Sequence, residues 1–276
     1  MNQIEHSGSW GRLSPSSVGR ALLFFKKMGF ARGVMKKFMA HLWSGFELRT
    51  PVDIRYAGLK FRVYPWDNTV EYKMLFGSKP RDWAEIKLLQ SYAGKDGVFL
   101  DIGANIGYYA LMAVHHGAGT VLAFEPNPKV FARLKFNIEA NDLSNTITAL
   151  PFALGDKVDT VTMTVSESDM GGSHISHLSG LAGTSIEVEM KPLAEVISSQ
   201  GISQVDALKI DVEGMEDAVL FPFFETSPRS LWPRLVIIEH TSQTAWKKDI
   251  LSWMMASGYQ EIERNRSNAM LCLSKQ

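Results

Sequence analysis

The sequence is poor in cysteine and contains no long apolar run. Cys272 is the single cysteine among 276 residues, so an internal disulfide and a cysteine-based metal cluster are both excluded. No stretch of about 18 consecutive apolar residues is present, which argues against a membrane-spanning helix. The amino-terminal residues also lack the apolar core and the cleavage site of a signal peptide. These absences predict a protein of the reducing cytoplasm.

An excess of charge of either sign is also missing. The 29 Lys and Arg residues balance 29 Asp and Glu residues, and 45% of all residues are hydrophobic. Nucleic acid is therefore not expected as a partner, because proteins that bind it generally carry a basic surplus. Length and composition predict one large globular domain with an appended segment.

The most informative stretch is an apolar run that ends in an acid and two glycines, Val98-Phe-Leu-Asp-Ile-Gly-Ala-Asn-Ile-Gly107. It predicts a buried strand, a tight turn and a helix. At Gly103 and Gly107 the missing Cβ lets the backbone approach a ligand or a neighbouring strand. A second apolar run ends at Glu125, whose carboxylate can accept hydrogen bonds from both hydroxyls of a ribose. Together the two turns predict a nucleotide-type site.

The turn departs from the dinucleotide fingerprint G-x-G-x-x-G, because Asn105 occupies the position of the second glycine. Asp101 would moreover repel a phosphate and attract a cation, such as the amino group of S-adenosylmethionine. An NAD-dependent oxidoreductase is therefore the weaker alternative. A non-catalytic Rossmann-like binding module is a third, which the retained acids at Asp101, Glu125 and Asp211 disfavour.

Strands and helices alternate from the first turn onward, which predicts an α/β fold with a Rossmann-like, doubly wound sheet. Two period-two strands, 160–165 and 185–190, interrupt the alternation. Residues 81–276 would form this domain. The expected strands are 98–100, 120–125, 147–152, 207–212, 234–239, 259–263 and 269–273, and the expected helices are 81–92, 108–114, 128–140, 215–224 and 244–257.

Residues 1–80 are expected to form an N-terminal extension. Its residues 6–46 contain seven Lys and Arg and no acid. Interleaved apolar residues predict two amphipathic helices divided near Gly29 or Gly33, and 53–64 predicts a hairpin. One hypothesis is peripheral contact with the anionic inner face of a membrane or with a lipid-linked substrate. The other is that the helices pack on the core or on a second subunit of a homodimer.

Two later strands also end in ionisable residues. Asp211 and Glu213 follow one buried strand, and Glu239 and His240 end the next. Because the carboxyl ends of parallel strands form the ligand-binding edge of a doubly wound sheet, we expect these four groups to converge.

The chain resembles the FkbM-type methyltransferases, a family of class I S-adenosylmethionine-dependent enzymes, over roughly Trp83 to Leu273. The resemblance is carried by four motifs, Asp101-Ile-Gly-Ala-Asn-Ile-Gly107, Phe124-Glu-Pro-Asn-Pro128, Ala153-Leu-Gly155 and Lys209-Ile-Asp-Val-Glu-Gly214. It implies a seven-strand sheet with the last strand antiparallel, S-adenosylmethionine as cofactor, and methylation of a hydroxyl on a sugar, glycan or small metabolite.

The resemblance also implies which residues bind the cofactor. The methionine part would contact Asp101, Gly103, Ala104, Asn105 and Gly107. The ribose would contact Glu125, with Pro126 and Asn127 beside it. The adenine would lie along Phe152 to Asp156, which includes Ala153 and Leu154. Asp211 would approach the cofactor from the neighbouring strand.

Methylation of a hydroxyl requires a group that removes its proton, because a neutral alcohol is a poor nucleophile. The candidate catalytic residues are His240, Asp211, Glu239 and His174, the last of which lies in a loop rich in Ser, Gly and His, 166–184. Histidine titrates near neutral pH, which favours His240 or His174. An alternative is that Asp211, Glu213, Glu239 and the two histidines bind a divalent cation that activates the acceptor, although metal-ligand spacing cannot be read across loops.

Overall fold

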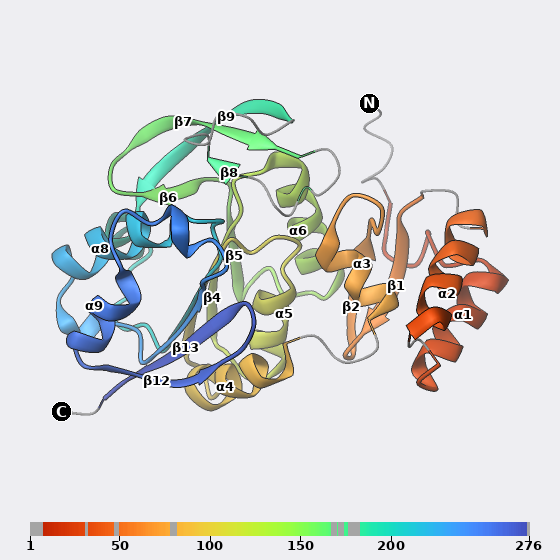
Figure 1. The fold of residues 1–276 in the computed structure, drawn as a ribbon, viewed down its shortest axis with the longest axis horizontal. Helices are drawn as coiled ribbons and strands as arrows, with labels where there is room; N and C mark the ends of the chain where they lie inside the picture. Colours follow the sequence, from red (N-terminus) through yellow and green to blue (C-terminus); the bar gives the residue numbers. More distant parts are fainter. Residues whose placement is uncertain are drawn as a thin grey trace.

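A seven-stranded sheet in the order β12-β13-β11-β10-β3-β4-β5 forms the centre of the protein (Figure 1). The computed structural model describes residues 8–30, 33–46, 50–77, 82–166, 170, 174–175 and 183–274. The last strand, β13, is antiparallel to both of its neighbours, and the pairs among β5, β4, β3, β10 and β11 are parallel. The predicted fold is confirmed. The strands are β3 (Val98–Ile102), β4 (Thr120–Phe124), β5 (Ile147–Leu150), β10 (Ala207–Ile210), β11 (Leu235–Glu239), β12 (Tyr259–Arg264) and β13 (Asn268–Leu273).

Helices cover both faces of this sheet. Alternate side chains of β4 point to opposite layers: Val121 and Ala123 pack with one set of helices, and Leu122 and Phe124 with the other. Burial on both faces explains why the strands are continuous apolar runs. The first layer contains α4 (Trp83–Ala93), α5 (Tyr108–His115) and α6 (Pro128–Ala140), and the second contains α7 (Leu193–Ser199), α8 (Glu216–Thr226) and α9 (Ile250–Ala256).

Two predicted elements end differently in the structure. The strand expected to reach Phe152 stops at Leu150, because Pro151 has no N–H to donate to the ladder. The chain then enters a second sheet as β6 (Ala153–Gly155). This change of direction brings residues 152–154 to the end of the central sheet.

The prediction of a single helix over 244–257 is wrong. A short 3-10 turn, η3 (Gln243–Ala245), is separated from α9 by an extended connection. There the backbone N–H groups of Lys247 and Lys248 donate to the Asp217 carboxylate at 2.8 and 3.1 Å. Asp249 then caps α9 by accepting the N–H of Ser252. These side-chain acceptors replace the helical hydrogen bonds.

The second sheet has the order β6-β9-β7-β8. Its long antiparallel pair joins β7 (Asp159–Val165) to β9 (Thr184–Pro192), which confirms the two period-two strands. β8 (His174–Ile175) adds a short edge beside β7. Most of the loop 166–184 lies outside the described residues.

The N-terminal part packs against the α4–α6 layer. It contains the two predicted helices, α1 (Ser17–Lys27) and α2 (Gly33–Phe46), and the predicted hairpin, β1 (Val52–Tyr56) and β2 (Leu59–Val63). A further helix, α3 (Thr69–Phe76), was not expected. These elements share one hydrophobic cluster with α4, α5 and α6. The boundary at residue 80 therefore stays a prediction. In the described ranges, no helix is long and apolar enough to cross a membrane.

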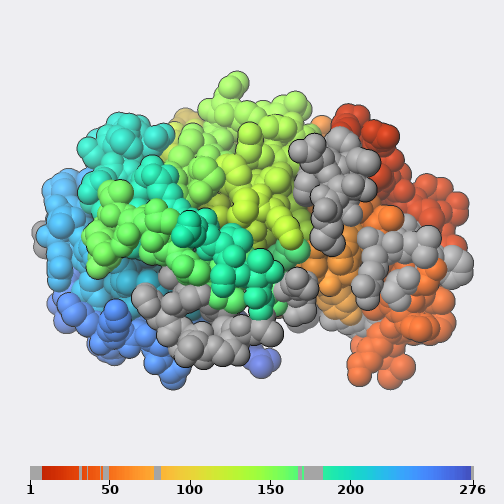
Figure 2. All heavy atoms as spheres, turned by 90° about the horizontal axis from the view of Figure 1, so that it is seen from above, coloured from red at the N-terminus to blue at the C-terminus, as the bar shows by residue number. Residues whose placement is uncertain are grey.

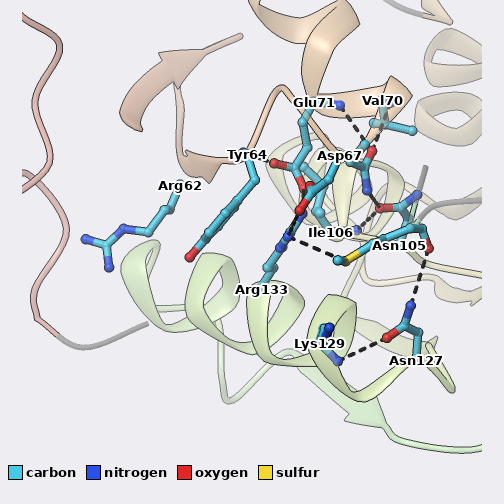
Figure 3. Close-up of polar contacts among 12 residues, drawn as sticks. Arg62, Tyr64, Asp67, Val70, Glu71, Asn105, Ile106, Asn127, Lys129 and Arg133 are labelled. Atoms are coloured by element: carbon cyan, nitrogen blue, oxygen red, sulfur yellow. Dashed lines mark hydrogen bonds and ion pairs between the residues drawn. The ribbon is translucent and has the colours of Figure 1, made fainter. Parts of the chain in front are cut away.

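A buried arginine joins this N-terminal part to α6 (Figure 3). The Arg133 guanidinium donates to both carboxylate oxygens of Asp67 at 2.8 Å and to Glu71 at 2.9 Å. Its carbon lies 3.8 Å from the centre of the Tyr64 ring. Glu71 also accepts the backbone N–H of Tyr64. The bidentate geometry and the burial of all three charges make this a specific link rather than a surface ion pair.

We expect Arg133→Met to lower the free energy of unfolding by about 3–5 kcal/mol, because it leaves two carboxylates buried without their counter-charge. Denaturant unfolding measures this loss. Lys157→Met is the matched control, since it removes an ion pair whose two side chains are 65% and 42% exposed, and its midpoint should not move. Equal midpoints for the two variants would contradict this role of Arg133.

Candidate active site

The turn after β3 is held by backbone contacts. The N–H groups of Gly103 and Ala104 both donate to the carbonyl of Phe124, at 3.1 and 2.8 Å. Gly103 has a φ of +76°, and a Cβ placed there would lie 2.0 Å from the Asp211 carbonyl oxygen. Asn105, with a φ of +52°, also adopts the left-handed conformation. Only glycine fits at Gly103, because β10 approaches the turn so closely.

Glu125 links this turn to the one after β4. Its two carboxylate oxygens accept the backbone N–H groups of Asn105 and Asn127, each at 2.9 Å. The side chain is buried, and burial raises the pKa of Glu125 to about 7 despite these two donors. The carboxylate therefore fixes both turns while it faces the cavity described next.

A cavity of about 530 Å³ lies beyond the carboxyl ends of the parallel strands. This is where ligands bind in doubly wound folds. Eight of the sequence-predicted cofactor residues line it, together with Glu213 and Glu239. The eight are Gly103, Ala104, Asn105, Glu125, Pro126, Ala153, Leu154 and Asp211.

Asp101, Gly107 and Asn127 were also predicted to bind the cofactor, but they are not among the residues that line the cavity. They hold the turns in place without lining the cavity. Asp101 accepts the N–H of Ala110 in the first turn of α5 at 2.9 Å. Gly107 caps α5, and a Cβ there would lie 2.6 Å from Leu134. The Asn127 side chain caps α6 by accepting the N–H of Lys129.

Lys209 is a site residue that the sequence prediction missed. It stands beside Asp101 in the parallel pair of β10 and β3. Its ammonium lies 3.2 Å from the Asp211 carboxylate and 5.0 Å from the centre of the Tyr109 ring. Lys209 and Tyr109 both line the cavity. The sequence signal that could have identified it is a lysine inside an apolar strand, two positions before Asp211. Residues two apart in a strand share a face, so Lys209 and Asp211 point the same way.

The pKa of Asp101 is raised above its ordinary value. Burial raises its pKa to about 6, and the nearby Lys209 charge opposes that shift. One carboxylate oxygen, Oδ1, is buried and has no hydrogen-bond partner among the described residues. A buried water that donates to this oxygen would satisfy it.

Glu239 and His240 separate at the tip of β11. Glu239 lines the cavity, accepts the N–H of Thr241 at 2.7 Å and the Thr241 hydroxyl, and has a pKa that burial raises to about 7. His240 is not among the lining residues: its Nε2 lies 3.2 Å from the Asn265 carbonyl. The expected convergence of His240 with Asp211, Glu213 and Glu239 is therefore not found. Successive side chains of a strand point to opposite sides, which explains the separation.

The structure says less about the two remaining catalytic hypotheses, which are His174 as the base and a bound divalent cation. His174 lies in β8 opposite Thr164, but its side chain is outside what the structure describes. Within the described part of the chain, no group of three or more His, Cys, Asp and Glu side chains is arranged to hold a metal ion. The metal-assisted alternative thus has no ligand set in these residues.

One wall of the cavity comes from segments without a recognisable motif. The Asn68 amide donates to the Asn105 side chain at 2.8 Å, so the cap of α3 touches the turn after β3. No sequence pattern indicated this contact, because the two segments are distant in the chain. The lining residues from these segments are Thr69, Val70, Lys73, Asp82, Asn265, Arg266, Ser267 and Asn268.

The residues present fit S-adenosylmethionine. Glu125 offers a buried carboxylate to the two ribose hydroxyls. Phe152 and Leu154 offer an apolar surface for the adenine, beside Pro126. The carboxylate of Asp211 and the unpartnered oxygen of Asp101 supply negative charge near the first turn, where the positively charged methionine part would lie.

Sheet order and site together define a Rossmann-like fold with a nucleoside-binding cavity. The methyltransferase FkbM domain matches residues 101–261, which is more than half of the chain. The chain therefore belongs to the FkbM methyltransferase family, whose members use S-adenosylmethionine. The family expected from the sequence is thereby confirmed.

Curated relatives match about half of the chain. A hexuronic acid methyltransferase, AglP of Haloferax volcanii, is 30% identical over 135 residues, which are 49% of this chain and 53% of the relative. The 31-O-demethyl-FK506 methyltransferase FkbM of Streptomyces tacrolimicus is 29% identical over 165 residues, 50% of this chain and 62% of the relative. The chain thus spans less than two thirds of either relative.

Solved structures with similarity include M. capricolum TrmK in complex with S-adenosylhomocysteine. It is 12% identical, with a TM-score of 0.40, and the alignment covers 68% of this chain and 66% of TrmK. Another is a putative rRNA methylase from Clostridium thermocellum, 7% identical with a TM-score of 0.44, where 70% of this chain and 96% of that chain are covered.

We expect cofactor affinity to depend on the charge of Glu125. Because its raised pKa is about 7, the carboxylate becomes protonated and loses an acceptor as pH falls through 7. Calorimetric titration with S-adenosylhomocysteine should show roughly tenfold weaker binding at pH 6 than at pH 8.

Glu125→Gln is the matched variant, since it keeps the shape and removes the titrating charge. It should bind weakly at both pH values, with a loss of about 1.5–3 kcal/mol at pH 8. Wild-type affinity in a folded Glu125→Gln protein would remove Glu125 from the ribose site.

Proposed function

We propose that the protein is an O-methyltransferase that methylates a hydroxyl of a sugar, a glycan or a small hydroxylated metabolite. The observation that carries this proposal is the placement of Glu239, with its near-neutral pKa, in the same cavity as Glu125 and the turn after β3. A proton acceptor beside the cofactor site is what methylation of an alcohol requires. One relative is named a hexuronic acid methyltransferase, and the name of another places its methyl group on an oxygen.

The composition of the wall supports a hydroxyl-rich acceptor. Away from the segment expected to hold adenine, the cavity lining includes amide, hydroxyl and charged side chains beside apolar ones such as Val70 and Met215. Such groups can donate to and accept from sugar hydroxyls. They are Thr69, Lys73, Asp82, Thr241, Asn265, Arg266, Ser267 and Asn268.

Each residue then has a distinct task. When bound, the sulfonium supplies an already activated methyl group. Glu239 would take the proton of the acceptor hydroxyl, since a base whose pKa lies near the working pH is most effective. The N–H groups of Thr241 and Ser242 hold that carboxylate in place. Lys209 fixes the orientation of Asp211, whose negative charge would face the cationic donor.

Asp211 is the second candidate for the base. Its side chain is about a third exposed to the cavity, and Lys209 contacts one of its two oxygens. Asp211 therefore also has an oxygen that can face the acceptor. The variants below distinguish the two candidates. The pH dependence of the rate does so as well, because the rate should follow a group that titrates near pH 7 if Glu239 is the base.

We expect Glu239→Gln to lower the rate of methyl transfer by roughly 10²–10⁴ and to leave S-adenosylhomocysteine affinity within a few-fold. In the wild type at saturating cofactor, kcat should decline as pH falls below about 7, because the Glu239 carboxylate is then protonated. The assay follows labelled methyl transfer from S-adenosylmethionine into glycan and metabolite fractions.

His240→Ala is the control, because its ring lies outside the cavity lining, and its rate should stay within a few-fold of the wild type. Loss of activity in His240→Ala with full activity in Glu239→Gln would restore the histidine as base. A rate that fails only in Asp211→Asn would assign the base to Asp211.

A further inference from the structure

The tip of the α1–α2 helical pair exposes a cluster of large apolar side chains. They lie between residues 24 and 38, at the end of α1, in the connection and at the start of α2. A surface of this kind is unusual on a soluble domain and marks a contact with another apolar phase. The exposed fractions are 60% for Phe24, 49% for Phe25, 59% for Met28, 54% for Phe30, 84% for Val34, 49% for Met35 and 54% for Phe38.

The base of the same helical pair is packed. Leu22, Met39 and Trp43 are buried, and the Trp43 ring lies 5.7 Å from that of Phe76 in α3. The Lys26 ammonium, whose pKa burial lowers to about 8, donates to the carbonyl of Met74. The core therefore accounts for the apolar residues at the base and leaves those at the tip uncovered. Figures 1 and 2 show α1 and α2 (red to orange) at the end of the molecule opposite α8 and α9.

The basic charge of the N-terminal segment indicates which kind of surface covers the tip. Residues 6–46 hold seven of the 29 Lys and Arg and none of the 29 Asp and Glu. Lys27 and Lys37 are exposed next to the apolar residues. A second copy docking tip to tip would bring like charges together, whereas an anionic surface complements them. The remainder of the chain has an excess of acids, which an anionic surface repels, so the basic tip is the end that faces it.

We propose that this tip, made up of the seven exposed apolar side chains named above together with Lys27 and Lys37, docks on an anionic lipid bilayer. The phenylalanine and methionine side chains enter the headgroup layer, and Lys27 and Lys37 contact lipid phosphates. Helices of 11 and 14 residues lie at the interface and do not span it. The protein is thereby held peripherally, and the contact does not depend on the identity of the methyl acceptor.

Sedimentation of the 276-residue protein with vesicles tests the proposal. Vesicles of phosphatidylcholine with about one third phosphatidylglycerol should bind it, and binding should weaken as salt rises. Lys27→Gln with Lys37→Gln should lower the partition coefficient roughly 30-fold, at about 1 kcal/mol per charge. Phe24→Ser with Phe25→Ser and Met35→Ser should lower it by more than tenfold.

Val158→Ser with Ile262→Ser is the matched control, because it removes exposed apolar side chains elsewhere on the surface, and its binding should equal that of the wild type. Circular dichroism confirms that the variants, altered only at exposed positions, remain folded. Equal pelleting with pure phosphatidylcholine at all salt concentrations would overturn the proposal. So would a wild-type dimer that the tip variant converts to a monomer while vesicle binding is absent.

Discussion

The carboxylate of Glu125 is the interaction on which the site depends. Backbone N–H groups from the turn after β3 and from the turn after β4 meet on its two oxygens. A single buried charge thus sets the distance between the two loops that a nucleoside must bridge. Desolvation opposes that charge, and the two donors offset only part of the cost, which is why its pKa stays near 7. The group expected to bind the ribose would therefore also sense pH.

The N-terminal part belongs to the site, although the family match starts at residue 101. Asn68 caps α3 and also contacts Asn105, whose backbone N–H donates to Glu125. Arg133 holds the same segment through Asp67 and Glu71. Residues of α3 then form part of the cavity wall. The segment around α3 thus supplies wall residues that the family motifs do not.

Much of this arrangement could be predicted from sequence because topology is a strong constraint. Acids that follow parallel strands must meet at one edge of the sheet, so Glu125, Asp211 and Glu239 could be placed without coordinates. The side to which a residue just past a strand end points depends on one position of register, and His240 was misplaced for that reason. Contacts such as that of Asn68 with Asn105 depend on tertiary packing and leave no local pattern. Lys209 could have been recognised, because a lysine in a buried strand needs a charged partner, and Asp211 two positions later shares its face.

The most direct measurement is a crystal structure of the protein with S-adenosylhomocysteine. The account predicts both ribose hydroxyls within hydrogen-bond distance of the Glu125 carboxylate, the adenine against Phe152 and Leu154, and the sulfur on the side of Asp211. A nucleoside bound elsewhere, or ribose hydroxyls directed away from Glu125, would contradict it.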